Sequence, residues 1–212
     1  MTPLARTGDA ESIYKSIWSV SVGRHLRKPA VPAAIFGLGA VAVYLSLVSA
    51  PGINGYLGAG LAVTMLAIAV IDRRTFIIPD WLNVAGGALA IVQATVQEQF
   101  SIVNSVTLPA LRGLSLALIF LALRYSYTRI RGRQGLGLGD VKLAFVAGAW
   151  LEWPMIPIAI QLAAFGGLSA YLLWRRRPSE SISAAKRRLP FGLFFAPAIW
   201  LCWLLEARCN FS

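Results

Sequence analysis

Two aspartates, Asp72 and Asp140, stand at the ends of long apolar runs in a chain that contains only nine acidic residues. An ionisable group beside hydrocarbon is costly and tends to be functional. If the two carboxyl groups approach closely, they cannot both ionise, and they titrate as a unit. The charged member could then take a proton from water while the protonated member donates one to a carbonyl. Position alone leaves open the alternative of two ordinary interfacial aspartates, each solvated or paired with an arginine.

A third acid, Asp80, follows Pro79 at the start of another apolar run. Proline favours the first turn of a helix and aspartate its cap, so this pair could simply begin a helix. The alternative role for Asp80 is substrate binding. Lys142 stands two positions after Asp140 and therefore points to a different helix face. It could orient the segment before it or face lipid headgroups, so two roles stay open for each residue.

Glycine alternates with leucine in residues 135–139, directly before Asp140. A phosphate-binding loop would need the spacing GxxxxGK[ST] after a strand, which this run lacks. Glycines beside a catalytic aspartate have another use, because a substrate backbone can approach where no side chain intervenes. We therefore expect Gly137 and Gly139 to shape a substrate site.

The composition predicts that membrane helices hold these residues. Hydrophobic residues make up 57% of the 212 residues and charged residues 14%, against roughly 25% charged residues in an ordinary soluble domain. The apolar residues gather into runs near the roughly 20 residues that a helix needs to cross a bilayer, whereas a soluble core of this size would need a polar shell. The runs are continuous rather than alternating, which favours helices over a barrel. The expected fold class is all-α, a polytopic helical membrane protein.

Seven apolar segments are predicted to form transmembrane helices. Their approximate ranges are 32–50, 56–72, 81–96, 108–126, 141–153, 155–174 and 189–206. Residues 141–174 could cross the membrane once or twice, and a single crossing would leave six transmembrane helices. Pro154 and Pro157 favour a break between two crossings. The expected organisation is a basic N-terminal segment 1–31, which could form an interfacial helix, a transmembrane domain 32–206 and a C-terminal tail 207–212.

The net charge of +11 would suggest a nucleic-acid partner in a soluble protein, but here the basic residues lie between the apolar runs. With a cytoplasmic N-terminus, all of them except Arg112 and Arg208 fall in or beside cytoplasmic loops, as the positive-inside bias requires. We therefore expect no nucleic-acid partner, a cytoplasmic N-terminus and an external C-terminus. This orientation places Asp72, Asp80 and Asp140 at the cytoplasmic face.

Three motifs, in this order along the chain, resemble those of a known family of membrane enzymes. Residues 72–82 resemble the family's first aspartate, followed seven residues later by proline in a Pro-Asp-x-Leu ending. Residues 137–140 read GLGD, the GxGD signature of intramembrane aspartic peptidases, and the longer stretch 139–151 looks like the version in bacterial prepilin peptidases. Residues 189–192 (LPFG) resemble that family's proline–phenylalanine–glycine motif. The chain thus resembles the prepilin (type IV leader) peptidases over about residues 61–205, in a short form similar to the Flp-type (Tad) pilus peptidases.

The resemblance implies an aspartic endopeptidase with Asp72 and Asp140 as its catalytic pair. Its partners would be the lipid bilayer and the basic leader of a type IV prepilin, Flp-type prepilin or pseudopilin, cleaved at the cytoplasmic face of the bacterial inner membrane. No cofactor and no metal are expected. The other motif residues, expected to bind substrate or support the site, are Gly137, Gly139, Asp80, Lys142, Pro79, Pro190 and Gly192.

The chain departs from classical members of that family in two respects. They carry an N-terminal cytoplasmic domain with paired CxxC motifs and N-methylate the new amino terminus, whereas this sequence contains no CxxC motif; methylation is therefore doubtful. Leu193 stands where many relatives have a second proline after the glycine. Neither departure touches the acid pair.

Two alternative functions use the same residues. A GxGD protease could act on other membrane helices, and a proton-coupled transporter could use Asp72 and Asp140 as relay groups. Transporters usually place such acids near the bilayer midplane, often within repeated halves. Here the acids are predicted at the membrane edge and the sequence shows no internal repeat, which favours the peptidase. The oligomeric state is not predicted.

Overall fold

The computed structural model describes residues 33–97, 102–132, 135–175 and 190–211. The chain divides into two compact units, residues 1–37 and 38–212, and the second contains all the contacts discussed below. The predicted interfacial helix within residues 1–31 and the basic loop 176–188 lie outside the described residues.

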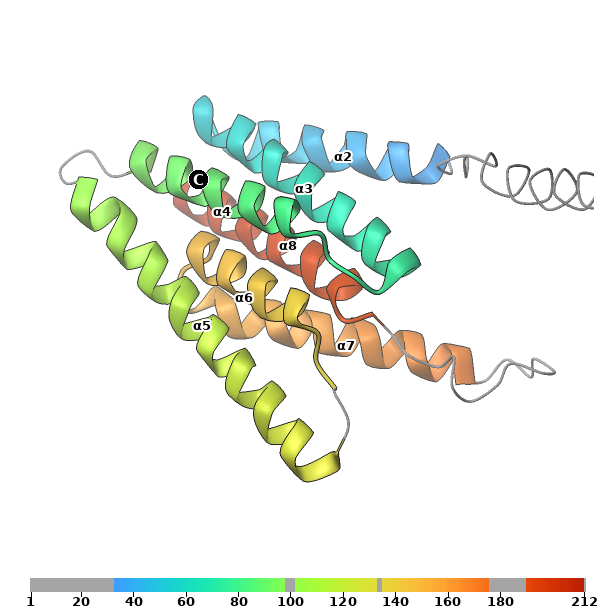
Figure 1. Ribbon diagram of the computed structural model, residues 1–212. Coiled ribbons are helices and arrows are strands. Elements are labelled where there is room, and N and C mark those ends of the chain that lie inside the picture. The colour runs from blue at the N-terminus through green and yellow to red at the C-terminus, as the bar shows by residue number, and fades with distance from the viewer. Residues whose placement is uncertain (1–32, 98–101, 133–134, 176–189, 212) are drawn as a thin grey trace, which may run out of the picture. The chain divides into compact units, whose positions relative to one another are not determined.

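The described residues form seven helices and no strand, as expected for the all-α class. The helices are α2 (Ala33–Ser49), α3 (Ile53–Thr75), α4 (Asp80–Gln97), α5 (Ile102–Arg131), α6 (Leu138–Trp150), α7 (Met155–Arg175) and α8 (Gly192–Phe211), shown in Figure 1. Each matches one of the seven predicted apolar segments. The predicted break between the fifth and sixth segments is confirmed, because α6 ends at Trp150 and α7 begins at Met155.

Four of these helices are long and apolar enough to cross a membrane: Ile53–Thr75 of α3, Val106–Arg131 of α5, Met155–Leu173 of α7 and Gly192–Cys209 of α8. The chain is therefore a multi-pass helical membrane protein. α6 has 13 residues and is about 20 Å long at the helical rise, less than the ~30 Å hydrocarbon core. α8 continues to Phe211, so residues 207–211 extend this helix where the sequence predicted a tail.

Local signals explain where the helices next to the aspartates begin and end. α3 ends at Thr75 because Phe76 adopts a left-handed conformation (φ 56°) and donates its N–H to the Asp72 carbonyl oxygen at 2.9 Å. α4 begins at Asp80, directly after Pro79, as the preference of proline for helix starts predicts. α6 begins after Gly137, which has extended backbone angles. These three ends lie within one part of the fold.

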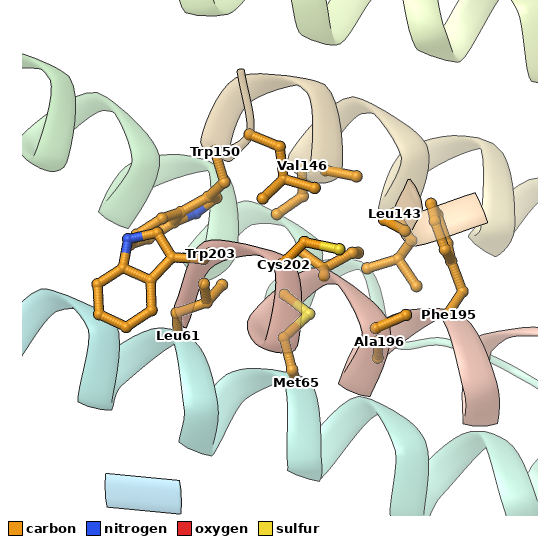
Figure 2. Packing of buried hydrophobic residues seen from close by; sticks show 14 of the residues in the cluster. Leu61, Met65, Leu143, Val146, Trp150, Phe195, Ala196, Cys202 and Trp203 are labelled. Carbon is orange, nitrogen blue, oxygen red and sulfur yellow. The ribbon is translucent and has the colours of Figure 1, made fainter. Parts of the chain in front are cut away.

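α8 holds the bundle together by packing against α3, α6 and α7. Figure 2 shows its Cys202 and Trp203 among Leu61 and Met65 of α3 and side chains of α6. Trp150 meets Trp203 edge to face with ring centroids 6.3 Å apart. In a bilayer the hydrophobic effect does not drive helices together, because lipid tails are as apolar as these side chains. Close van der Waals packing therefore stabilises these contacts.

Glycines allow the closest helix contacts. A Cβ on Gly58 of α3 would lie 1.7 Å from the Trp203 ring, and one on Gly148 of α6 would lie 2.6 Å from the Arg112 carbonyl oxygen of α5. Both positions therefore require a residue without a side chain.

Consecutive helices α3 to α8 run in alternating directions (Figure 1). The end of α3 and the starts of α4, α6 and α8 consequently lie at the same end of the bundle, and side-chain contacts link them there. This arrangement brings together segments far apart in sequence.

Candidate active site

Asp72 lies in the last turn of α3 and is 4% exposed. Its Oδ2 accepts a hydrogen bond of 2.9 Å from the backbone N–H of Leu193, in the first turn of α8. The N-terminus of a helix carries partial positive charge and free N–H groups. This contact therefore stabilises a negative charge on Asp72.

Gly192 makes this approach sterically feasible. A Cβ at this position would lie 2.7 Å from Asp72 Oδ2 and 2.9 Å from Ile78 Cδ1. The sequence motif 189–192 placed Gly192 near the site, but it gave no sign that the backbone of Leu193 would bind Asp72. The departure at Leu193 has a structural meaning, because a proline there would have no N–H to donate.

Asp140 lies in the first turn of α6 and is 9% exposed. Its Oδ2 accepts a hydrogen bond of 3.1 Å from the N–H of Gly137, the residue that caps the helix. The residue lies outside the four long apolar helices. Burial raises the pKa of the Asp140 carboxyl to about 6; the Gly137 hydrogen bond opposes this shift and the charge of Asp72 adds to it. The two acids thus interact electrostatically.

Both aspartates open into one cavity of about 280 Å³, which we name the aspartate cavity. Its lining residues are Asp72, Phe76, Ile77, Ile78, Asp80, Gly137, Leu138, Gly139, Asp140 and Lys142. The cavity thus gathers Asp72, Asp80, Asp140, Lys142, Gly137 and Gly139 of the predicted site residues. Gly192 lies next to the Asp72 carboxyl group but is not among the lining residues. Pro79 and Pro190 lie in the segments that lead into α4 and α8.

Sequence reasoning missed the apolar part of this lining. Phe76 and Ile77 are exposed, and Ile78 is buried between the helix starts. A Cβ on Gly139 would lie 3.0 Å from Ile78 Cβ, so this glycine allows α6 to approach the segment that follows Asp72. The only sequence signal for these residues was their position between Asp72 and Pro79.

Asp80 and Lys142 form an ion pair at the cavity, with Lys142 Nζ 2.6 Å from Asp80 Oδ1. Asp80 also occupies the first residue of α4, where its charge suits the helix dipole. Both alternatives for Asp80, helix start and substrate contact, are compatible with this position. In the described part of the chain, no three His, Cys, Asp or Glu residues are grouped to hold a metal ion.

A second polar pocket of about 60 Å³ lies at the other ends of α4, α6 and α8. We name it the tryptophan pocket; it is lined by Gln93, Gln97, Arg112, Trp150, Glu152, Trp203, Glu206 and Ala207. Glu206 Oε1 accepts a hydrogen bond of 2.8 Å from the Glu152 N–H. The sequence singled out none of these acids, since neither belongs to a motif.

Fold and site together define a multi-pass helical membrane protein with two buried aspartates at one end of its bundle. Residues 59–172, more than half of the chain, match the type IV leader peptidase family, and the chain belongs to this family. The predicted resemblance is confirmed.

Relatives of this chain include curated proteins named prepilin leader peptidase/N-methyltransferase. The protein of Dickeya chrysanthemi is 37% identical over 62% of this chain and 44% of its own length. The protein of Pectobacterium carotovorum subsp. carotovorum is 34% identical over 62% of this chain and 45% of its own length. The protein of Burkholderia pseudomallei (strain K96243) is 29% identical over 82% of this chain and 55% of its own length. The chain spans about half the length of these relatives. No solved structure matches it.

Proposed function

We propose that the chain is an aspartic endopeptidase of the bacterial inner membrane that removes the leader from type IV prepilins, Flp-type prepilins or pseudopilins. The observation that carries this proposal is the meeting of Asp72 and Asp140 in one cavity. They come from different helices, are nearly buried, and interact electrostatically. Two carboxyl groups in this relation share one proton, as aspartic peptidase chemistry requires.

The hydrogen bonds around the two acids support different roles. Asp72 faces the first turn of α8 through the Leu193 N–H, which favours its charged form. Asp140, whose pKa burial raises to about 6, is the better proton carrier. We assign Asp72 as the general base and Asp140 as the general acid.

In the first step, Asp72 removes a proton from water while the water oxygen attacks the peptide carbonyl carbon. Asp140 donates its proton to the carbonyl oxygen, which gives a neutral tetrahedral intermediate. In the second step, Asp140 takes that proton back and Asp72 passes its proton to the leaving nitrogen. The carbon–nitrogen bond then breaks, and both acids return to their starting states.

The surroundings of the cavity support a substrate that arrives from the bilayer. Phe76, Ile77 and Leu138 line the cavity with exposed apolar side chains, which suit contact with a hydrophobic substrate segment. Arg73 and Arg74 lie at the same end of α3. Basic residues are enriched at cytoplasmic span ends, so we propose that cleavage occurs on the cytoplasmic side.

The relatives' names also include N-methyltransferase. We propose only the peptidase step for this chain, because the chemistry argued above belongs to the two aspartates. Other membrane helices remain the alternative class of substrate. A transporter role is disfavoured, since both acids lie near helix ends and not at the middle of a span.

Substitution of either acid tests the proposal. Asp72→Asn and Asp140→Asn are expected to reduce cleavage of a co-expressed prepilin by at least about a thousandfold, since each removes a group that transfers a proton. The measurement is the gel shift of the prepilin, with the amount of membrane-inserted protein determined in parallel. Asp80→Asn is the control and should retain at least partial activity. Full processing by either dyad variant would rule out the proposed pair.

A further inference from the structure

The peptide group between Leu136 and Gly137 connects Asp140 to a cation on another helix. Its N–H, which belongs to Gly137, donates a hydrogen bond of 3.1 Å to Asp140 Oδ2. Its carbonyl oxygen, which belongs to Leu136, accepts a hydrogen bond of 2.6 Å from Nη1 of Arg124 on α5. The guanidinium of Arg124 and the carboxyl group of Asp140 are therefore bound to opposite ends of one peptide group.

Hydrogen bonds in such a chain strengthen one another, because each bond polarises the group that makes the next. An arginine side chain stays charged in proteins, so Arg124 draws electron density toward the Leu136 carbonyl oxygen and makes the Gly137 N–H a better donor. A better donor favours the charged form of the carboxyl group that accepts from it. Arg124 thus strengthens the contact that opposes the effect of burial on the pKa of Asp140.

The same face of α5 also fixes the place of this segment. Tyr127 comes three residues after Arg124, so the two side chains lie on one side of the helix. A Cβ on Gly135 would lie 2.5 Å from the Tyr127 ring, so the segment before α6 passes directly against this ring. α6 itself packs against α5, where a Cβ on Gly113 would lie 2.7 Å from the Phe145 carbonyl oxygen. α5 therefore holds both α6 and the segment that leads into it.

Other charged groups lie near Asp140 on the neighbouring helices. Those that line the aspartate cavity are Asp72 of α3, Asp80 of α4 and Lys142 of α6. The described start of α8 presents no charged side chain, since residues 190–195 read PFGLFF. The exposed arginines at the ends of α3 and α5 are Arg73, Arg74, Arg129 and Arg131. Among the described basic residues, Arg124 is the one bound to the peptide group that contacts Asp140.

We propose that Arg124 is a positioning residue that acts on the Asp140 carboxyl group through the peptide group between Leu136 and Gly137. Its loss should release this peptide group, so that Asp140 is held less firmly and keeps its proton to higher pH. Arg124 is not a catalytic residue, because it is not among the residues that line the aspartate cavity. The consequence for the reaction rests on the proposed peptidase function, whereas the effect on Asp140 can be measured without a substrate.

Titration of Asp140 in the purified protein, in detergent, tests the contact directly. The infrared absorption of the protonated carboxyl group gives the titration midpoint, and Asp140→Asn, which lacks this group, identifies the band. Arg124→Met removes both the charge and the donor, so the midpoint should rise by about half a pH unit. Arg129→Met, which removes an exposed arginine of the same helix, is the matched control and should leave the midpoint unchanged.

Two further variants separate the charge of the side chain from its shape. Arg124→Gln is neutral and shorter, and it should raise the midpoint as Arg124→Met does, so either variant suffices if the other does not fold. Arg124→Lys keeps a positive charge and should give a midpoint closer to the wild-type value. A wild-type midpoint in Arg124→Met or in Arg124→Gln would overturn the proposal.

The pH dependence of prepilin cleavage connects this contact to the proposed reaction. As the general acid, Asp140 must carry its proton, so kcat/KM falls as the pH rises through the Asp140 pKa. In Arg124→Met this descending limb should move to higher pH, and the plateau should fall by about tenfold because Asp140 is less well placed. A merely structural role would lower the plateau without moving the limb.

The two measurements can fail separately. If the Asp140 midpoint shifts as expected but the wild-type protein cleaves no prepilin tested, the proposed function is wrong and the action of Arg124 on Asp140 stands. If a prepilin is cleaved but the midpoint and the descending limb stay fixed in Arg124→Met, the role of Arg124 is wrong and the peptidase function stands.

Discussion

Each end of the helix bundle holds a pair of acids, but Asp72 and Asp140 are buried, whereas Glu206 is half-buried and Glu152 is exposed. At one end, Asp72 and Asp140 line a cavity of about 280 Å³ and accept backbone hydrogen bonds from helix starts. At the other, Glu206 accepts a hydrogen bond from the Glu152 backbone, and the positive charge of Arg112 acts on it. A pair of acids near helix ends is therefore found at both ends of the bundle, and its presence does not by itself mark a functional site.

The two sites differ in their volume and in the positive charges that lie beside their acids. The tryptophan pocket measures about 60 Å³, which is room for about two water molecules and not for a peptide. Its acids also have an arginine among the lining residues. In the aspartate cavity the cation Lys142 is bound to Asp80, which leaves the proposed catalytic pair, Asp72 and Asp140, to share one proton. We infer from this comparison that an acid is reactive where a substrate can reach it and where no neighbouring cation neutralises its charge.

The largest expected difference between the two ends appears when one acid at each end is replaced by its amide. Asp140→Asn should cost at least about a thousandfold in prepilin cleavage, while Glu206→Gln should change cleavage less than about twofold. The side-chain amide of the Glu206→Gln variant would keep an oxygen that can accept the Glu152 N–H, so the helix contact survives. The measurement is kcat/KM in detergent. Comparable losses for both variants would contradict the division of roles.

A methyl group introduced at position 192, next to the Asp72 carboxyl group, should have the next largest effect on cleavage. In Gly192→Ala the new Cβ would meet Asp72 Oδ2 at 2.7 Å and displace the carboxylate. Misplacement of a catalytic group by about 1 Å can cost about a hundredfold in rate. Gly87→Ala is the matched control, because a Cβ there meets nothing within 4 Å. Equal activity of the two variants in the same assay would show that the position of Asp72 is not critical.

Removal of the Leu193 N–H should have a smaller effect. Leu193→Pro deletes the donor to Asp72, and the loss of a hydrogen bond to a charged group costs about 1–3 kcal/mol, or roughly tenfold to a hundredfold in rate at most. Leu193→Ala retains the donor and should keep nearly full activity. Thermal unfolding of both variants in detergent is the control for damage to α8. If the proline variant matched the alanine variant, the assignment of Asp72 as the charged acid would lose its support.

The sequence predicted helix positions better than helix ends. Apolar runs located all seven helices, and Pro154 located the break before α7. However, α5 continues to Arg131 and α8 to Phe211, beyond the predicted ends at 126 and 206. A helix needs only its backbone hydrogen bonds to continue past the apolar run, so capping contacts decide its end. The left-handed Phe76 that ends α3 is such a contact and has no signal in hydropathy.

The sequence by itself determined the membrane class, the seven helical segments and the identity of the candidate acids, because these follow from composition, periodicity and short motifs. Only the tertiary structure decided which groups act on one another. The contacts of Leu193 with Asp72 and of Lys142 with Asp80 join residues 121 and 62 positions apart. Such contacts depend on which helices become neighbours, and that choice rests on the fit of whole helix surfaces, such as Trp203 over Gly58, which no local pattern encodes.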